Sequence, residues 1–215
     1  MNKSEIIQQA SAFVRQTLAN EPTGHDWYHI NRVVKLSEKI AQKEGGDIFK
    51  IKLVALLHDI SDYKLYKTEQ EGIDKLNCFL DKIIDDEQFK NEIKITINGI
   101  SFKGGLNAQQ LSLEGKIVQD ADRLDAIGAI GIARAFAYGG NKNRAMHTPN
   151  QKPKSFKTQE EYKANKGSTI NHFYEKLLLL KDKFNTPTAI KMAEQRHQFM
   201  EKFLAQFYAE WEAEV

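Results

Sequence analysis

Apolar residues recur along this chain every three to four positions, which is the spacing of an amphipathic α-helix. Alternation of apolar and polar residues over the length of a strand is nearly absent, and the chain has only four prolines. The pattern predicts an all-α protein with helices over residues 6–18, 26–44, 51–59, 69–84, 85–99, 113–138 (one helix or two), 168–184 and 187 to near the C-terminus.

The predicted helix over residues 51–59 is apolar on nearly every side, as expected of a helix at the centre of a bundle. It ends in two polar residues, His58 and Asp59, which would emerge from the core into a cleft. Because adjacent helical residues point about 100° apart, one metal ion can bind both side chains only near a helix end.

Residues 139–167 break the helical pattern, since they are polar, carry two prolines and show little periodicity. A long insertion of this kind is either disordered or a functional flap. The remaining pattern predicts one domain over residues 1–215. Thr186 and Pro187 would start a last helix of about 40 Å, long enough to brace the bundle or to form a homodimer contact.

Composition excludes several classes of protein. Charged residues make up 28% of the chain and balance to a net charge of +2, which disfavours a nucleic-acid partner. Cys78 is the only cysteine, so the chain has no intramolecular disulfide and no cysteine-based zinc site. The polar N-terminus and the short apolar runs predict a cytoplasmic protein with no membrane partner.

Four separated side chains are of the type that ligates divalent metals: His29, His58, Asp59 and Asp122. Two imidazoles and two carboxylates can hold one cation and leave positions open for water and a phosphate oxygen. Each signal has an ordinary alternative. His29 or His58 alone fits a hydrogen-bonded core histidine, and Asp59 alone fits a residue that caps a turn. His147, His172 and His197 match no motif.

Three motifs occur in a fixed order, HIxRV at 29–33, LLHDI at 56–60 and DADRLD at 120–125. Together they resemble the H…HD…D signature of the HD superfamily of metal-dependent phosphohydrolases. Their flanking residues are similar to those of its bacterial YedJ/YpgQ-type branch, and the resemblance covers most of the chain. It implies a single HD-type helical bundle domain with a long polar loop near 139–167.

The resemblance also implies the roles of individual residues. His29, His58, Asp59 and Asp122 would be the metal ligands, with His29 favoured over His25 by the Arg and Val that follow it. Asp122 is favoured over Asp120 and Asp125, which become candidates for supporting the ligands or capping a helix. Asp62 is a candidate catalytic residue that orients the attacking water, although a surface turn residue fits equally. The remaining candidates are His25 for the leaving group and three lysines for the substrate phosphates: Lys64, Lys67 and Lys103.

The activity implied is that of a (deoxy)nucleoside triphosphate pyrophosphohydrolase, in which a metal-activated water attacks phosphorus and the products are a monophosphate and pyrophosphate. The substrate would be a small phosphorylated molecule, a nucleotide. Mn²⁺ is the favoured ion, with Fe²⁺, Co²⁺, Ni²⁺ or Mg²⁺ as alternatives. The alternative activities are a 5′-nucleotidase, a cyclic-nucleotide phosphodiesterase or a helical module that binds metal or ligand without turnover.

Overall fold

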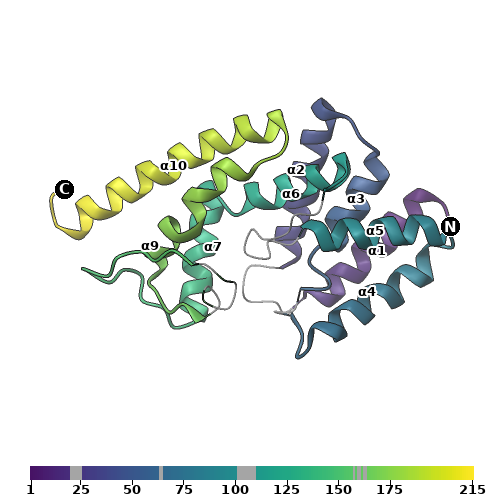
Figure 1. Cartoon of the computed structure of the whole chain (residues 1–215), viewed down its shortest axis with the longest axis horizontal. Coiled ribbons are helices and arrows are strands. Elements are labelled where there is room, and N and C mark those ends of the chain that lie inside the picture. The colour runs from purple at the N-terminus through teal and green to yellow at the C-terminus, as the bar shows by residue number, and fades with distance from the viewer. Residues whose placement is uncertain (20–25, 63–64, 101–109, 157, 159–160, 162–163) are drawn as a thin grey trace. The chain divides into compact units, whose positions relative to one another are not determined.

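The computed structural model describes residues 1–19, 26–62, 65–100, 110–156, 158, 161 and 164–215. Every regular element within these ranges is helical, which confirms the all-α prediction (Figure 1). The chain divides into two compact units, Met1–Ala121 (unit 1) and Asp122–Val215 (unit 2). The single domain expected over residues 1–215 stays a prediction.

Unit 1 is built around one buried helix. It contains α1 (Lys3–Thr17), α2 (Trp27–Glu44), α3 (Ile48–Leu57), α4 (Glu69–Ile83), α5 (Glu87–Ile100) and the larger part of α6 (Leu113–Asp125). α3 packs against α1, α2 and α5, and its residues from Leu53 to Leu57 are all buried. The apolar sequence of α3 therefore correctly predicted its place at the centre of a helical core.

Local capping fixes where α2 and α3 begin. Asp26 precedes α2 in extended conformation, and its carboxylate accepts a hydrogen bond from the backbone N–H of His29 at 2.8 Å. Asp47 does the same for Phe49 at the start of α3, also at 2.8 Å. These caps satisfy backbone donors that have no partner inside the helix. The cap of α2 thereby holds His29 in the first turn of its helix.

Unit 2 contains the end of α6, α7 (Gly128–Asn141), α9 (Thr169–His172), a π-helical turn η2 (Phe173–Leu177), a 3₁₀ segment η3 (Leu178–Lys183) and α10 (Pro187–Trp211). α10 packs along α7 and η3, and α9 packs on α7. Thr186 caps α10 by accepting from the backbone N–H of Ala189, with Pro187 in the first turn as predicted. At 25 residues, α10 is about 38 Å long.

The structure adds detail to two predicted helical stretches. The stretch 113–138, predicted as one helix or two, forms two helices, because Gly128 has a φ of +76° and interrupts the helical backbone. The stretch 168–184 is helical but not one α-helix, since its hydrogen bonding changes from α to π to 3₁₀. Apolar periodicity predicts that a segment is helical, but it does not determine whether each N–H donates to the carbonyl three, four or five residues earlier.

Two glycines of α7 lie in close contact with neighbouring segments. A Cβ on Gly131 would lie 2.2 Å from the carbonyl oxygen of Ala126, and one on Gly139 would lie 2.2 Å from Oγ1 of Thr169. Both distances are far below van der Waals contact. Any larger residue at position 131 or 139 would therefore clash with its neighbour.

The polar segment after α7 is joined to α9 by backbone hydrogen bonds. The N–H groups of Thr169 and Ile170 donate to the carbonyls of Ala145 and Met146 at 2.9 and 3.0 Å. The guanidinium of Arg144 donates to the carbonyl of Asn165 at 3.0 Å. The flap role of residues 139–167 stays a prediction. Among the described helices, none is long and apolar enough to cross a membrane.

Candidate metal centre

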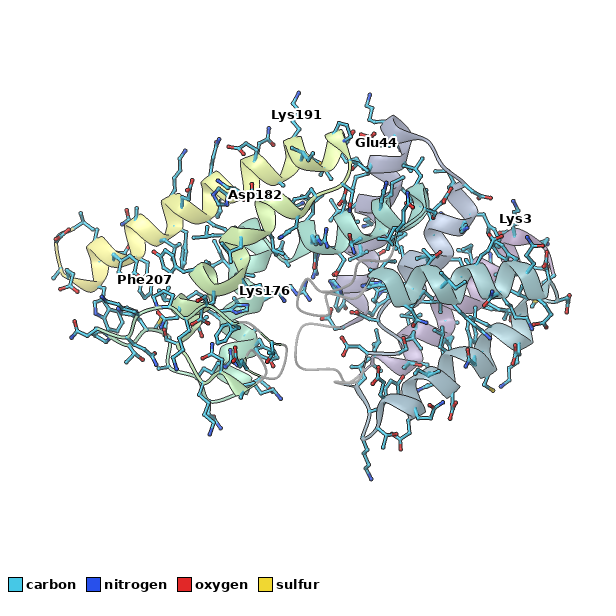
Figure 2. The ribbon with its side chains drawn as sticks, in the orientation of Figure 1. Lys3, Glu44, Lys176, Asp182, Lys191 and Phe207 are labelled. Atoms are coloured by element: carbon cyan, nitrogen blue, oxygen red, sulfur yellow. The ribbon has the colours of Figure 1, made fainter. Side chains whose placement is uncertain are left out.

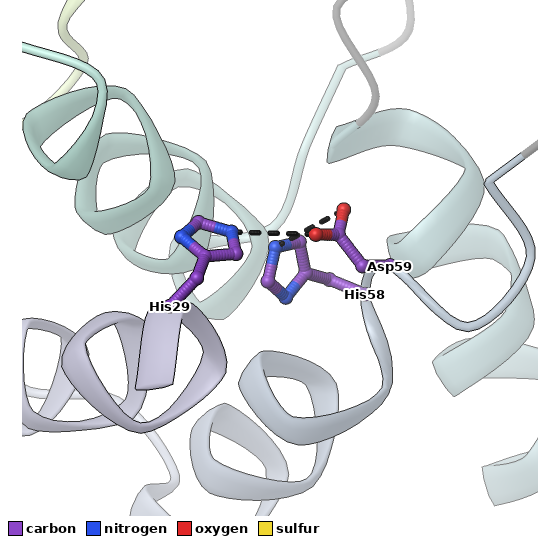
Figure 3. A group of neighbouring side chains, drawn as sticks. All are labelled: His29, His58 and Asp59. Carbon is purple, nitrogen blue, oxygen red and sulfur yellow. Dashed lines mark ion pairs between the residues drawn. The ribbon is translucent and has the colours of Figure 1, made fainter. Parts of the chain in front are cut away.

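His29 enters the site from the first turn of α2. Its side chain is fully buried, with an exposed fraction of 0%. The sequence places it one helical turn after the capping residue Asp26, whose carboxylate holds its backbone N–H. Burial leaves the imidazole Nε2 facing the other residues of the site rather than solvent (Figure 3).

His58 enters the site from the C-terminal end of α3, where it is the capping residue. Its Nδ1 lies 2.8 Å from the carbonyl oxygen of Ala55. Because a carbonyl can only accept, the Nδ1–H tautomer forms this hydrogen bond, and Nε2 then carries a lone pair in the neutral ring. This hydrogen bond to the helix thus leaves Nε2 of His58 facing Asp59.

Asp59 follows in the turn after α3 and faces both histidines. Its Oδ2 lies 3.3 Å from Nε2 of His29, and its Oδ1 lies 3.4 Å from Nε2 of His58. One ligand atom from each of the three residues lies within 4.8 Å of the others (Figure 3). The two imidazole rings stand edge to face, with centroids 5.5 Å apart.

These three residues fit a divalent cation. A lone pair on Nε2 of His58 and a carboxylate oxygen of Asp59 are both acceptors, so their approach to 3.4 Å calls for positive charge between them. The donor set of two imidazole nitrogens and a carboxylate suits first-row divalent metals. All three residues are buried, which strengthens their electrostatic interaction with an ion. His58 and Asp59 lie at the C-terminal end of α3. Only at such a helix end can two adjacent residues bind the same metal ion.

Asp122, the fourth predicted ligand, lies half-buried in the last turn of α6. It is the first residue of unit 2, whereas the other three residues belong to unit 1. The structure brings together His29, His58 and Asp59, and the role of Asp122 as a ligand stays a prediction.

The helix end that carries Asp122 is held by two arginines. The carboxylate of Asp125 accepts from the guanidinium of Arg134 at 2.8 Å, and Arg196 donates to the carbonyl of Leu124. Burial lowers the pKa of Arg196, while the charge of Asp125 acts in the opposite direction. Sequence reasoning missed both arginines. The available signal was Asp125 itself, since a buried carboxylate requires a partner.

The predicted helper residues divide into two groups. Asp62 is half-buried, and its backbone N–H donates to the carbonyl of Asp59 at 3.0 Å, so its position is tied to that of a predicted ligand. Lys67 is exposed, and its backbone N–H donates to Glu71 at 3.1 Å. The other three candidates lie outside the described residues: His25, Lys64 and Lys103.

Comparison with known proteins identifies the class of enzyme. Residues 26–127 match the family model described as HD domain, a range that includes all four predicted ligands. The chain belongs to the HD domain family, and it is a metal-dependent phosphohydrolase of the HD superfamily. Family membership also implies a divalent metal, and His29, His58 and Asp59 form a cluster that could hold one.

Among its relatives is YpgQ of Bacillus subtilis, which is 38% identical over 208 residues, covering 96% of this chain and 94% of YpgQ. A solved structure of YpgQ in complex with ADP superposes with a TM-score of 0.77 over 98% of this chain and 97% of that one, at 36% identity. A Lactobacillus plantarum protein superposes with a TM-score of 0.89 at 37% identity, covering 99% of this chain and 100% of the other. An HD-superfamily hydrolase from Bacillus thuringiensis gives a TM-score of 0.77 at 42% identity over the same shares.

Proposed function

We propose that this protein is a nucleoside triphosphate pyrophosphohydrolase that releases a nucleoside monophosphate and pyrophosphate. The observation that carries the proposal is the convergence of two buried imidazoles on the carboxylate of Asp59, at 3.3 and 3.4 Å. The relative YpgQ was crystallised with ADP, which supports a nucleotide as the ligand class. Resemblance to the YedJ/YpgQ-type branch supports cleavage between the α- and β-phosphates.

In this proposal His29, His58, Asp59 and Asp122 hold the ion, for which we favour Mn²⁺. When bound, such an ion lowers the pKa of a water and polarises a phosphoryl oxygen. Asp59 balances the charge of the ion, and Ala55 keeps the Nδ1 proton of His58 away from the site. Burial of all three residues excludes bulk water from the ligand side of the site.

Asp62 is proposed to orient the attacking water. Its backbone bond to Asp59 fixes the main chain on which its carboxylate is carried, and a carboxylate is an acceptor for a water proton. Lys64, Lys67 and Lys103 are proposed to bind the negatively charged phosphates of the substrate, and His25 is proposed to assist the leaving group. Because the lysines would bind the triphosphate before the reaction, their loss should change KM more than kcat.

A product assay tests the proposal directly. The full-length protein is incubated with a panel of nucleoside and deoxynucleoside triphosphates, cyclic nucleotides and monophosphates, each with Mn²⁺, Co²⁺, Ni²⁺, Fe²⁺ or Mg²⁺. Separation of the products by ion-exchange chromatography should give pyrophosphate and monophosphate in equal amounts. Inorganic phosphate released from monophosphates would instead indicate a 5′-nucleotidase, and turnover of cyclic nucleotides alone a phosphodiesterase.

Matched variants assign the activity to the site. Asp59→Asn removes the charge that faces both histidines, and it should abolish turnover and reduce metal binding measured by calorimetry. Asp85→Asn makes the same chemical change at an exposed position and should behave as wild type. Retained turnover in Asp59→Asn, with no metal bound, would contradict the proposed centre. Metal binding without turnover of any substrate would favour the non-catalytic module.

A further inference from the structure

An open cavity of about 550 Å³ lies in unit 2. Its walls come from the chain segment 147–153, from Asn171 of α9, from Tyr174 of η2 and from Tyr208 of α10. Small-molecule sites in proteins have volumes of roughly 300–1,000 Å³, so this cavity is large enough for one organic ligand. None of His29, His58 and Asp59 lines it.

One wall of the cavity is aromatic. The ring of His147 packs edge-on against Tyr208 and Trp211, with centroids 5.4 and 4.8 Å apart. Figure 2 shows Phe207 on the side of α10 toward this segment, and its ring lies 5.9 Å from that of His147. A wall of fixed rings offers planar surface on which a flat ligand stacks without ordering flexible side chains.

The polar groups of the cavity are held in place. The side-chain amide of Asn171, which is 3% exposed, donates to the carbonyl of Gln151 at 3.0 Å and ties the loop to α9. A hydrogen bond joins the hydroxyls of Tyr174 and Tyr208, and burial raises the pKa of Tyr174 to about 12. That phenol is therefore a neutral hydrogen-bonding group at physiological pH.

The turn that supplies Tyr174 has an unusual backbone. η2 is π-helical, a geometry that is rare and is found often at functional sites. The neighbouring Glu175 accepts from the backbone N–H of Lys154 at 3.0 Å and from the side chain of Asn165 at 2.7 Å. The π-turn thus presents a phenol to the cavity and uses its next residue to anchor the surrounding loop.

The charge around the cavity favours an anion. Lys152 is exposed and forms no ion pair within the described part of the chain. None of the described lining residues is acidic. An exposed lysine beside aromatic rings and amides, with no acidic residue in the described lining, is complementary to a flat molecule that carries negative charge.

We infer that this cavity binds a planar aromatic anion of the chemical class of a nucleoside monophosphate. The base lies against the aromatic wall of His147 and Tyr208, the amides of the 147–153 segment meet its polar edge, and Lys152 meets the phosphate. This is a second site, built entirely from unit 2, and it does not depend on the reaction proposed for the metal centre.

Trp211 provides a probe for the inference, because it contacts His147 in the cavity wall. The chain has two tryptophans, so Trp27→Phe leaves Trp211 as the only indole. Titration of this variant with AMP should change Trp211 fluorescence saturably, both with Mn²⁺ and with EDTA. Ribose 5-phosphate lacks the base and adenosine lacks the phosphate, so each should bind at least about tenfold more weakly.

Single substitutions locate the site. Lys152→Ala is a change at an exposed position and should weaken AMP about tenfold while leaving adenosine unaffected. Tyr174→Phe should weaken both. Lys181→Ala removes an exposed lysine outside the lining and should change neither.

Two results would overturn the inference. One is the absence of saturable binding of AMP, by fluorescence and by calorimetry, up to millimolar concentration. The other is loss of AMP binding in Asp59→Asn with Lys152→Ala unaffected, which would assign the binding to the metal centre. Failure of the pyrophosphate assay would leave the inference intact, since the titration requires no turnover.

Discussion

The carboxylate of Asp125 and the guanidinium of Arg134 form an ion pair at 2.8 Å in which the Asp125 side chain is 1% exposed. The pair joins the end of α6 to α7 across the break at Gly128. Asp122 lies one turn before Asp125 on α6. The pair therefore holds the helix end that carries the predicted fourth ligand.

Removing Arg134 should destabilise the protein strongly. Arg134→Met removes the guanidinium that is paired with the buried Asp125 carboxylate, and loss of one partner of a buried pair costs about 3–5 kcal/mol. The free energy of unfolding in urea measures the effect. Lys191→Met, an exposed lysine of α10 (Figure 2), is the control and should change stability by less than about 0.5 kcal/mol. Equal stability of the two variants would contradict a structural role for the pair.

His58→Ala should reduce metal affinity by more than the roughly 10–100-fold that loss of an outer hydrogen-bond partner costs. The substitution removes a nitrogen that faces Asp59 at 3.4 Å. Calorimetric titration with Mn²⁺ measures the change. His197→Ala, another buried histidine that is outside the cluster, is the control. Unchanged affinity in His58→Ala would remove His58 from the proposed ligands.

Asp62→Asn should separate catalysis from metal binding. An amide cannot accept a proton from water as a carboxylate does, so kcat should fall about 10²–10⁴-fold while the affinity for Mn²⁺ stays near that of wild type. Steady-state kinetics and calorimetry on the same preparation test both parts. Wild-type kcat in this variant would leave Asp62 as an ordinary turn residue.

Stability should fall between pH 6.5 and pH 5 because of His172. Burial first, and the charges of Lys176 and Arg144 second, lower the pKa of His172 from 6.5 to about 3 in the folded protein. The unfolded chain therefore binds a proton at pH 5 that the folded chain does not, and the resulting slope approaches about 1.4 kcal/mol per pH unit. Urea unfolding of His172→Gln across this window should show a smaller slope than wild type. Identical slopes would exclude His172 as the source.

Two glycines of α7 should respond oppositely to alanine. Gly131→Ala places a methyl group 2.2 Å from the carbonyl oxygen of Ala126, so the backbone must move, at a cost of at least about 2 kcal/mol. A Cβ on Gly140 meets nothing within 4 Å, and Gly140→Ala should stabilise the protein by about 0.4–1 kcal/mol. Thermal unfolding distinguishes the two variants. A stable Gly131→Ala protein would contradict the close approach of α7 to Ala126.

The sequence predicted the helices well because burial repeats along each of them. It predicted the position of α3 from its apolar surface, and the start of α10 from Thr186 and Pro187. The break at Gly128 was harder to locate, since a positive φ depends on how α6 and α7 pack and not on local periodicity. The changes of hydrogen bonding within 169–183 were invisible for the same reason.

Three of the predicted ligands lie together in the structure. His29, His58 and Asp59 were identified from motifs, and their role as ligands stays a prediction. Arg134 and Arg196 were missed because their partners lie 9 and 72 residues away in the chain. The unit 2 cavity was missed because it exists only where three distant segments meet. A motif identifies residues by their type and spacing in the sequence. The arginine bonds and the cavity depend instead on how the folded backbone brings distant residues together.

The hydrogen bond between Nδ1 of His58 and the carbonyl of Ala55 gives His58 a structural role besides its proposed role in the metal centre. Ala55 lies in the last turn of α3, where carbonyl oxygens find no N–H further along the helix. The imidazole supplies that missing donor through Nδ1 and keeps Nε2 for the site. A residue proposed for chemistry thus also completes the central helix of the fold, so replacing it would loosen the end of α3 as well as empty a coordination position. The end of the core helix and the proposed metal centre therefore depend on one side chain.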